Sequence, residues 1–383
     1  MRRSLEVALS QLNSEQREAA TERGHCLVMA CPGSGKTRTL AVKAALLLDS
    51  EPLARTCIVT FTKDGASELK RRTIDILDGD AASGNRLIAG TFHGLCYRML
   101  SKVRKINLKN IVSDAEQFHY AERALAEVKI FDVDKHAALS LIEHARSLPH
   151  LADARAKLLA DVYLDIMRRN GKLDFSDLVI DTIAGLESGA IPPIPAAYML
   201  IDEFQDTDWL QYRWARQHSA NGTKITVVGD DDQAIFGWRF AMGYEGMMTF
   251  ADDHDAHRVV LGHNYRCRSE ILDAAGRVIV YNINRVPKTL VAAKGPGGSV
   301  GCDEYATIAD EALAILDAFR DFASEDYSAA VIGRTNRSLK TIEAVLKPAG
   351  IPCTITRSAS LFRAIETHVY RFEGAIGATD DCG

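Results

Sequence analysis

The sequence contains no apolar run of about 18 residues, the length that a membrane span requires. Its basic start is interrupted by Glu6 and Gln11, so it does not resemble the apolar core of a signal peptide. The eight cysteines form no C-x-x-C pair and no zinc-binding spacing, which is typical of reduced thiols in a cytosolic protein. These absences predict a cytoplasmic protein with no membrane partner.

The sequence also lacks a surplus of positive charge. Lysine and arginine number 46 against 51 acidic residues, which gives a formal net charge of −5. Any nucleic-acid site must therefore be a local patch in a groove. With 47% hydrophobic and 25% charged residues the composition is that of a globular protein, and a length of 383 residues predicts two or three domains.

The most informative stretch that is present is Ala30-Cys31-Pro32-Gly33-Ser34-Gly35-Lys36-Thr37. It follows the apolar run 26–29, which is predicted to be a buried strand, and it precedes a helical pattern that opens at Arg38. Strand, glycine-bearing loop and helix in this order predict a P-loop, whose backbone N–H groups wrap a phosphate at a helix N-terminus. We expect Lys36 to reach the β- and γ-phosphates of ATP and the Thr37 hydroxyl to ligate Mg²⁺. A tight turn with a surface lysine is the alternative, and it does not explain the flanks.

Strands alternate with helices on both sides of a long helical stretch. The strands are expected at residues 57–61, 87–89, 198–201, 225–228 and 259–261, which argues for a parallel sheet covered on both faces. Residues 98–196 carry only helical patterns and predict an all-helical insertion. The sequence therefore predicts an α/β core from residues 1–97 and 197–266, this insertion, and the start of a second α/β unit in residues 267–383.

Polar side chains with catalytic potential follow the expected strands. Asp202 and Glu203 come directly after the strand at 198–201, where ligands bind in open α/β sheets. Two adjacent acids are usually a solvated surface, but in a P-loop protein they fit a metal ligand and a general base, respectively. Gln233 is expected to sense the γ-phosphate, and Arg266 offers a guanidinium for transition-state charge.

Taken together, these motifs resemble those of superfamily 1 DNA helicases of the UvrD/Rep/PcrA type, from about Leu12 to Asp381. The resemblance implies a RecA-like ATP-binding core, in which Gln16 reads adenine, Tyr265 stacks on adenine and Arg266 meets the γ-phosphate. The ordered segments that carry it are 12–16, 30–38, 60–71, 91–93, 174–178, 201–211, 229–239 and 264–266. A nucleotide kinase would explain neither Gln16 nor residues 264–266.

The resemblance also implies 3′-to-5′ movement on single-stranded DNA or a 3′-tailed duplex. Single strands are bound by aromatic stacking beside polar contacts to the backbone. A phenylalanine near a strand end is often simply core, and for Phe236 the two readings are level. Trp238 favours stacking because it lies just past the expected γ-phosphate sensor. The matching residues are Phe61, Thr91, Phe92, His93, Phe236, Trp238 and Arg239.

The chain departs from the family pattern in three ways. Phe240 stands where glycine is usual, and Cys267 replaces the usual serine. The sequence stops before the family's motifs V and VI, which predicts an incomplete second RecA-like domain unless a partner chain or dimer completes it. The alternative function is therefore a module that binds ATP and single-stranded DNA without acting as a motor.

Overall fold

The structure, a computed structural model, describes residues 2–104, 106–237, 240–322, 329–356 and 368–372. Its contacts divide the chain into two compact units, Met1–Ser299 and Val300–Gly383, and each is described here by itself. The sequence places a domain boundary after residue 266, and residues 267–299 belong by their contacts to the first unit. The domain assignment from the sequence stays a prediction.

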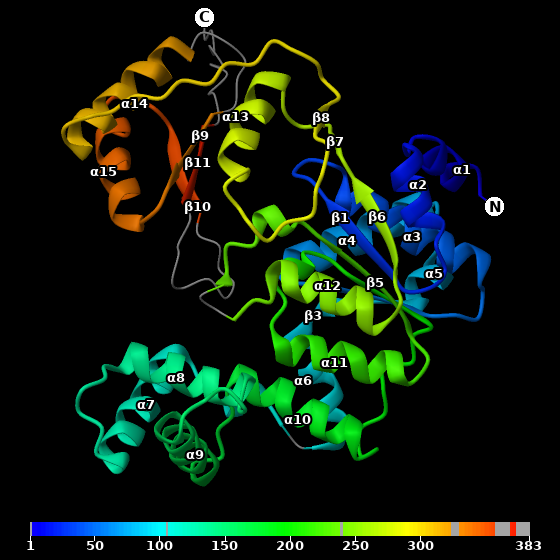
Figure 1. Cartoon of the computed structure of the whole chain (residues 1–383), viewed down its shortest axis with the longest axis vertical. Coiled ribbons are helices and arrows are strands. Elements are labelled where there is room, and N and C mark those ends of the chain that lie inside the picture. Colours follow the sequence, from blue (N-terminus) through cyan, green and yellow to red (C-terminus); the bar gives the residue numbers. More distant parts are fainter. Residues whose placement is uncertain (1, 105, 238–239, 323–328, 357–367, 373–383) are drawn as a thin grey trace, which may run out of the picture. The chain divides into compact units, whose positions relative to one another are not determined.

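The first unit is built on a six-stranded sheet in which all neighbouring strands are parallel (Figure 1). The strand order is β3-β2-β4-β5-β1-β6, so that β1 lies between β5 and β6. This confirms the predicted parallel sheet. The strands are β1 (Cys26–Ala30), β2 (Thr56–Thr60), β3 (Leu87–Thr91), β4 (Tyr198–Ile201), β5 (Lys224–Gly229) and β6 (His257–Leu261).

Helices cover both faces of this sheet because side chains alternate along its strands. Val28 packs on one face, with α1 (Arg3–Ser10), α2 (Ser14–Thr21), α3 (Lys36–Ser50) and α4 (Lys63–Ile76). Leu27 packs on the opposite face, with α6 (Phe92–Val103), α10 (Phe175–Glu187), α11 (Trp209–Ala220) and α12 (Gly243–Asp253). Short elements complete the unit: α5 (Ala81–Arg86), α13 (Ser269–Ile279), the parallel pair β7 (His263–Asn264) and β8 (Val291–Ala292), and the 3₁₀ turns at 108–110, 204–206 and 231–233.

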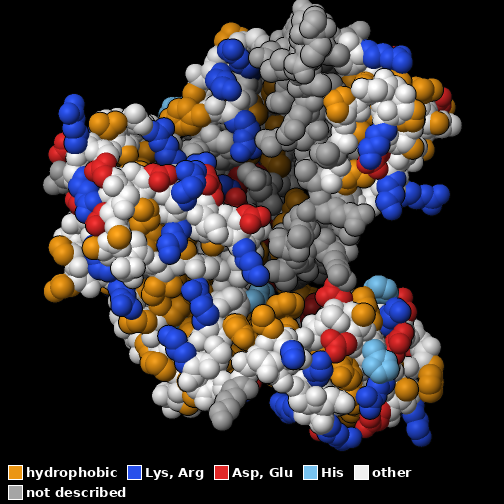
Figure 2. Space-filling model, turned by 180° about the vertical axis from the view of Figure 1, so that it is seen from behind, with side chains coloured by type: hydrophobic (Ala, Val, Ile, Leu, Met, Phe, Trp, Pro, Cys, Tyr) orange, Lys and Arg blue, Asp and Glu red, His pale blue; other side chains and the backbone are white. Residues whose placement is uncertain are grey.

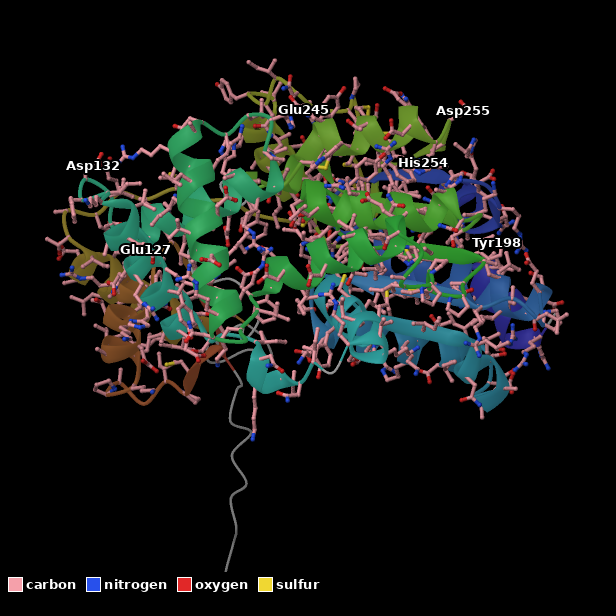
Figure 3. All side chains as sticks on the ribbon, turned by 90° about the horizontal axis from the view of Figure 1, so that it is seen from below. Glu127, Asp132, Tyr198, Glu245, His254 and Asp255 are labelled. Carbon is pink, nitrogen blue, oxygen red and sulfur yellow. The ribbon has the colours of Figure 1, made fainter. Side chains whose placement is uncertain are left out.

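The stretch between β3 and β4 is helical, as predicted, and its middle part has a core of its own. The helices α7 (Asp114–Val128), α8 (Lys135–Ser147) and α9 (Ala154–Arg169) bury apolar residues against one another. Figure 3 shows Glu127 and Asp132 of this bundle at one end of the unit and Tyr198, at the start of β4, near the other. None of the described helices is long and apolar enough to cross a membrane.

A buried ion-pair cluster joins this bundle to α10. Asp174 caps α10 by accepting from the backbone N–H of Asp177 at 2.8 Å, and its own N–H donates to the Asp177 carboxylate. Arg146, whose side chain is 4% exposed, contacts Asp174 at 2.6 Å and Asp177 at 2.5 Å. The acidic pair at 174–177 thus starts a helix and neutralises a buried arginine.

The second unit contains α14 (Ile308–Phe322), β9 (Ala330–Gly333), α15 (Asn336–Leu346), β10 (Cys353–Thr356) and β11 (His368–Phe372). Strand β11 lies between β9 and β10 and runs antiparallel to both. Consequently β9 and β10, which α15 connects, run in the same direction, as in a β-α-β unit. A β-α-β unit agrees with the α/β character expected for this part of the chain, whereas the antiparallel strand β11 between its two strands was not expected.

We expect Arg146→Met to lower the free energy of unfolding by about 3–5 kcal/mol, because it leaves two buried carboxylates without a counter-charge. The matched control is Arg155→Met, since Arg155 pairs with Asp132 on the surface of the same bundle. Its cost should be below about 1 kcal/mol. Urea unfolding followed by circular dichroism measures the free energy of unfolding of both variants. Equal losses would contradict the assignment of Arg146 as the buried counter-charge of Asp174 and Asp177.

Candidate nucleotide-binding site

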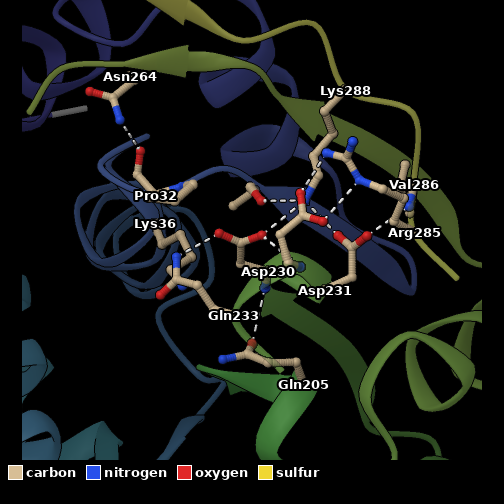
Figure 4. Close-up of polar contacts among 12 residues, drawn as sticks. Pro32, Lys36, Gln205, Asp230, Asp231, Gln233, Asn264, Arg285, Val286 and Lys288 are labelled. Atoms are coloured by element: carbon tan, nitrogen blue, oxygen red, sulfur yellow. Dashed lines mark hydrogen bonds and ion pairs between the residues drawn. The ribbon is translucent and has the colours of Figure 1, made fainter. Parts of the chain in front are cut away.

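The predicted site residues lie at one edge of the six-stranded sheet, where its strands end. The P-loop, residues 30–37, follows β1, and Asp202 with Glu203 follows β4. The acidic loop, defined as residues 230–233, follows β5, and residues 264–266 follow β6. Because the strands are parallel, these segments meet although they are far apart in the sequence (Figure 4).

Two glycines let the P-loop turn tightly at this edge. Gly33 has φ +66° and Gly35 has φ +81°, a left-handed region that glycine adopts at little cost. A Cβ atom on Gly35 would lie 2.8 Å from Gln16 Nε2, and one on Gly33 would lie 2.6 Å from Arg266 Cβ. Both positions therefore require glycine for conformation and for space.

The carbonyls of every second residue from Ala30 to Ser34 in the P-loop accept hydrogen bonds from side chains that are distant in the sequence. In a loop whose N–H groups turn inward to an anion, the carbonyls turn outward and need donors of their own. These donors hold the loop in a shape suited to phosphate. The pairs are Lys288 Nζ with the Ala30 carbonyl at 3.1 Å, Asn264 Nδ2 with Pro32 at 2.6 Å, and Gln16 Nε2 with Ser34 at 2.8 Å.

Gln16 is fixed at both ends of its amide. It is 4% exposed, and its Oε1 accepts from the backbone N–H of Asn13 at 3.0 Å while Nε2 donates to Ser34. The contact with Asn13 belongs to a capping box that starts α2, in which the Gln16 N–H also donates to Asn13 Oδ1 at 2.8 Å. The structure thus brings Gln16, a buried residue of α2, to the P-loop.

Asn264 organises the turn that carries Tyr265 and Arg266. Its side chain is fully buried, and Oδ1 accepts from the backbone N–H groups of Arg266 at 2.9 Å and Cys267 at 2.7 Å. Cys267 thus contributes its backbone, which a serine would also supply. The Tyr265 side chain is 43% exposed, its hydroxyl accepts from Asn13 Nδ2 at 3.1 Å, and the Arg266 side chain is exposed beside the P-loop.

Lys36 and Glu203 form an ion pair, with Nζ 2.5 Å from Oε2. Glu203 has φ +51°, an uncommon conformation for a residue with a side chain, and such strain is typical of functional loops. The neighbouring Asp202 is buried, and its Oδ1 accepts from the Glu203 N–H at 3.0 Å. Burial and the charge of Glu203 raise the pKa of Asp202 to about 6, although Lys36 opposes the shift.

The donor set here fits a divalent cation. Thr37 lies in the first turn of α3, half-buried, and offers a hydroxyl. Asp202 offers a buried carboxylate whose pKa is raised by burial and by the charge of Glu203. Hydroxyl and carboxylate oxygens are ligands that Mg²⁺ prefers.

Four buried side-chain oxygens around these segments have no hydrogen-bond partner among the described residues, although such groups are normally satisfied. Burial and Glu203 raise the pKa of Asp206 to about 7, against the effect of Lys36. The sequence includes Asp206 in a motif without giving it a role. The four atoms are Ser34 Oγ, Asp206 Oδ1, Thr207 Oγ1 and Gln211 Oε1.

Comparisons with known proteins agree with this geometry. The UvrD/REP helicase N-terminal domain model matches residues 12–255, and the UvrD-like helicase C-terminal domain model matches residues 259–368. The chain belongs to the UvrD/REP helicase family.

Curated relatives of this UvrD/REP chain are named ATP-dependent DNA helicase PcrA. The protein of Staphylococcus epidermidis is 30% identical over 92% of this chain and 51% of its own length. That of Leuconostoc citreum is 33% identical over 91% and 50%, and that of Staphylococcus aureus 29% over 92% and 51%. The chain spans about half the length of the curated relatives it matches.

The residues that the UvrD/REP resemblance assigns to DNA differ in how far their side chains are exposed. Phe92 is 2% exposed and packs edge-on between Phe61 and Trp214, with ring centroids 6.0 and 5.7 Å apart. The prediction that Phe92 stacks on a base is therefore wrong, because both faces of its ring lie in the core.

The other predicted DNA contacts lie at helix starts and loops. Thr91 caps α6 by accepting from the Gly94 N–H at 3.2 Å, and the His93 ring meets Phe175 edge-on at 5.4 Å. Phe61 and Phe236 are half-buried. Trp238 and Arg239 lie outside the described residues.

Phe240 shows why its family position usually carries glycine. Its φ is +61°, in the left-handed region where a side chain is disfavoured. Its ring stacks on His144 of α8, with centroids 5.2 Å apart and planes 27° apart. The departure from the family pattern thus adds a contact between the loop after β5 and the helical bundle.

Charge on the surface is mixed. Over the described residues on the face in Figure 2, lysine and arginine side chains alternate with aspartate and glutamate. This distribution agrees with the net charge of −5 and gives no continuous basic surface on that face. It fits the expectation that a nucleic-acid site is local.

We expect Asp206→Asn to stabilise the protein at pH 8 but not near pH 4. Burial raises the pKa of Asp206 to about 7 in the folded state. Between about pH 4 and 7 the folded state therefore keeps a proton on Asp206 that the unfolded state, in which Asp206 has its ordinary pKa, has released. Stability therefore falls as pH rises from about 4 to 7, and asparagine removes this loss. Melting temperatures measured from pH 4 to pH 8 should show that Asp206→Asn melts roughly 2–4 °C above the wild type at pH 8.

The control for this pH profile is Asp132→Asn. A hydrogen bond from Arg155 lowers the pKa of Asp132, so its substitution should not stabilise the protein at pH 8. If the melting temperature of Asp206→Asn changes with pH as that of the wild type does, Asp206 is not an acid whose pKa is raised in the folded protein.

Proposed function

We propose that the chain carries the ATP-binding portion of an ATP-dependent DNA helicase or translocase, which couples ATP hydrolysis to movement along single-stranded DNA. The observation that supports this most strongly is the meeting of Gln16, the P-loop, Glu203, the acidic loop and Asn264 at one sheet edge. Each of these segments is one that the family resemblance assigns to ATP. The PcrA relatives carry the same activity in their names.

In this proposal the P-loop N–H groups and Lys36 hold the β- and γ-phosphates. Phosphate oxygens compete with Glu203 for the Lys36 ammonium, so nucleotide binding frees the Glu203 carboxylate. Thr37 and Asp202 would hold Mg²⁺, which when bound neutralises charge on the phosphate oxygens. One ion pair thus links occupancy of the phosphate site to release of the base.

Hydrolysis then follows from the positions of the remaining side chains. Water attacks the γ-phosphorus, the bond from phosphorus to the bridging oxygen of ADP breaks, and Glu203 accepts the proton of the water. Gln233 and Arg266 donate to the γ-phosphate oxygens, where charge accumulates. Inorganic phosphate and ADP are the products.

The base of ATP is assigned to the segments that flank the P-loop. Tyr265 offers an exposed ring on which adenine can stack, and the Gln16 amide lies beside Ser34 with a second N–H available. Arg38 is exposed on α3 next to the phosphate loop. These roles come from the family resemblance, and they agree with the exposure of Tyr265 and Arg38 and with the position of the buried Gln16 beside the loop.

Single-stranded DNA is assigned to the loops that follow β2, β3 and β5. The candidates that remain after Phe92 are Phe61, Thr91, His93, Phe236, Trp238 and Arg239. Since Phe236 and Trp238 come directly after the acidic loop, a change at Gln233 on hydrolysis would be passed to the stacked bases. We propose 3′-to-5′ movement by family resemblance.

The second candidate is a module that binds ATP and single-stranded DNA without moving. It stands beside the first candidate because the activity in the PcrA names belongs to proteins of which the chain spans about half the length. A partner chain or dimer would then complete the motor. We also propose a cytoplasmic location, in keeping with seven described cysteines that are all free thiols.

We expect Lys36→Ala to lower ATP hydrolysis by at least about 100-fold, because it removes the side chain that stabilises the phosphates in the transition state. The measurement is the rate of phosphate release with and without oligo(dT), alongside the same assay on Lys157→Ala, an exposed lysine of α9. Stimulation of the wild type by DNA favours the motor. Binding without stimulation favours the module, and unchanged hydrolysis in Lys36→Ala would contradict the site itself.

We expect Trp238→Ala to weaken binding of single-stranded DNA by about 1–3 kcal/mol, the contribution of one stacked base. Fluorescence anisotropy with labelled oligo(dT) measures the affinity. Phe131→Ala serves as the control, because Phe131 is an 82% exposed aromatic residue on the helical bundle, away from the sheet edge. An affinity loss shared by both variants would argue against stacking at Trp238.

A further inference from the structure

Lys288 lies on the segment between α13 and β8 and reaches into the sheet edge. Its ammonium is 2.8 Å from Asp230 Oδ1, 2.6 Å from Asp231 Oδ1 and 3.2 Å from Asp232 Oδ2. It also donates to the Ala30 carbonyl at 3.1 Å. The side chain is 0% exposed, so these four partners replace its entire hydration shell.

The three carboxylates have the arrangement of a cation site, since one oxygen of each lies within 4.8 Å of those of the other two. The chain supplies the cation itself. Arg285 forms a two-point ion pair with Asp232, at 2.9 and 2.8 Å, and the Val286 N–H donates to Asp231 Oδ2 at 2.6 Å. Burial opposes the charge of Lys288, but the carboxylates outweigh it and raise the pKa of the ammonium.

Asp230 connects Lys288 to the expected γ-phosphate sensor. One carboxylate oxygen, Oδ1, accepts from Lys288, and the other, Oδ2, accepts from Gln233 Nε2 at 2.5 Å (Figure 4). A carboxylate accepts only, so this bond fixes which end of the Gln233 amide faces Asp230. The amide oxygen and the second N–H of Gln233 are left to face other groups.

Asp230 also connects to the expected base. Its backbone N–H donates to Gln205 Oε1 at 2.9 Å, and Gln205 Nε2 donates to Glu203 Oε2 at 3.1 Å. Glu203 is in turn paired with Lys36. Asp230 is fully buried, so its position, set by Lys288, is shared by both branches of this network.

We propose that Lys288 is a positioning residue of the nucleotide site, whose ammonium takes the place of a metal ion among Asp230, Asp231 and Asp232 and holds Asp230 so that the Gln233 amide faces the γ-phosphate. The inference rests on the proposed function, because it assumes that ATP binds at the P-loop. Through Ala30, the same ammonium ties the start of the P-loop to the acidic loop. Lys288 does not touch the nucleotide in this account.

The test compares affinities for ATPγS and ADP, by competition with a fluorescent ADP analogue, so that no turnover is required. The wild type should prefer ATPγS, and Lys288→Met should lower this preference by about tenfold, the loss expected for one hydrogen bond to a charged group. The affinity for ADP should fall less than the affinity for ATPγS, because Lys288 also donates to the Ala30 carbonyl at the start of the P-loop. Gln233→Ala should lose the same preference, and the double variant Lys288→Met/Gln233→Ala should lose no more than either alone.

Two further variants separate positioning from stability. Lys43→Met removes another buried lysine, whose ammonium donates to the Ala19 and Glu22 carbonyls at the C-terminal end of α2. This variant should lower the melting temperature but keep the preference for ATPγS. Should Lys288→Met fail to fold, Lys288→Met/Asp231→Asn restores the charge balance. Asp230 still lacks its cation in that variant, so the preference should still fall.

The outcomes distinguish this inference from the function on which it rests. Full ATPγS preference in folded Lys288→Met or Lys288→Met/Asp231→Asn overturns the role of Lys288 and leaves ATP binding intact. Additive losses in Lys288→Met/Gln233→Ala also overturn it. A wild-type chain that binds ATPγS and ADP equally well overturns the role of Gln233 as a γ-phosphate sensor and with it the role of Lys288. A wild-type chain that binds neither nucleotide overturns the proposed function together with this inference.

Discussion

The nucleotide site depends on how the outward-facing carbonyls of the P-loop are satisfied. A loop that turns its N–H groups toward an anion exposes its carbonyls on the other side, and buried carbonyls need donors. Gln16, Asn264 and Lys288 supply one donor each, to Ser34, Pro32 and Ala30. They come from α2, from the segment after β6 and from the segment before β8. The loop that binds phosphate is thus also the point at which three distant segments are tied together.

This constraint explains why the loop tolerates so little substitution at two positions. The donors can reach the carbonyls only if the backbone comes close to them, and a Cβ atom on Gly33 or Gly35 would meet Arg266 or Gln16. The same closeness makes the site responsive. In the proposed function, a shift of the P-loop on nucleotide binding would move the partners of its carbonyls, namely Gln16, Asn264 and, through Lys288, the acidic loop.

The sequence predicted those parts of the structure that local patterns encode. Strand β4 has its predicted bounds, the parallel sheet is confirmed, and the site segments meet because each follows a strand of that parallel sheet. Phe92 was assigned wrongly because a phenylalanine after a strand has the same local signature in a core as on a binding surface. Lys288 and Arg285 were missed because no periodicity or spacing marks a lysine that meets its carboxylates only after folding. Strand β11 depends in the same way on non-local pairing.

The acids of the site fall into two groups that differ in their counter-charge. Asp230, Asp231 and Asp232 face Lys288 and Arg285, so the chain itself offsets most of their charge, and the ion pairs fix their geometry. Asp202 is buried and Asp206 is half-buried, neither forms an ion pair with a described side chain, and burial together with Glu203 raises both pKa values. Maintaining such a pair of acids costs stability in the free protein, and a bound cation or a proton transferred from water would relieve that cost. A carboxylate left uncompensated beside a phosphate loop is therefore a stronger sign of chemistry than a cluster of acids, because the cluster here already contains its cation.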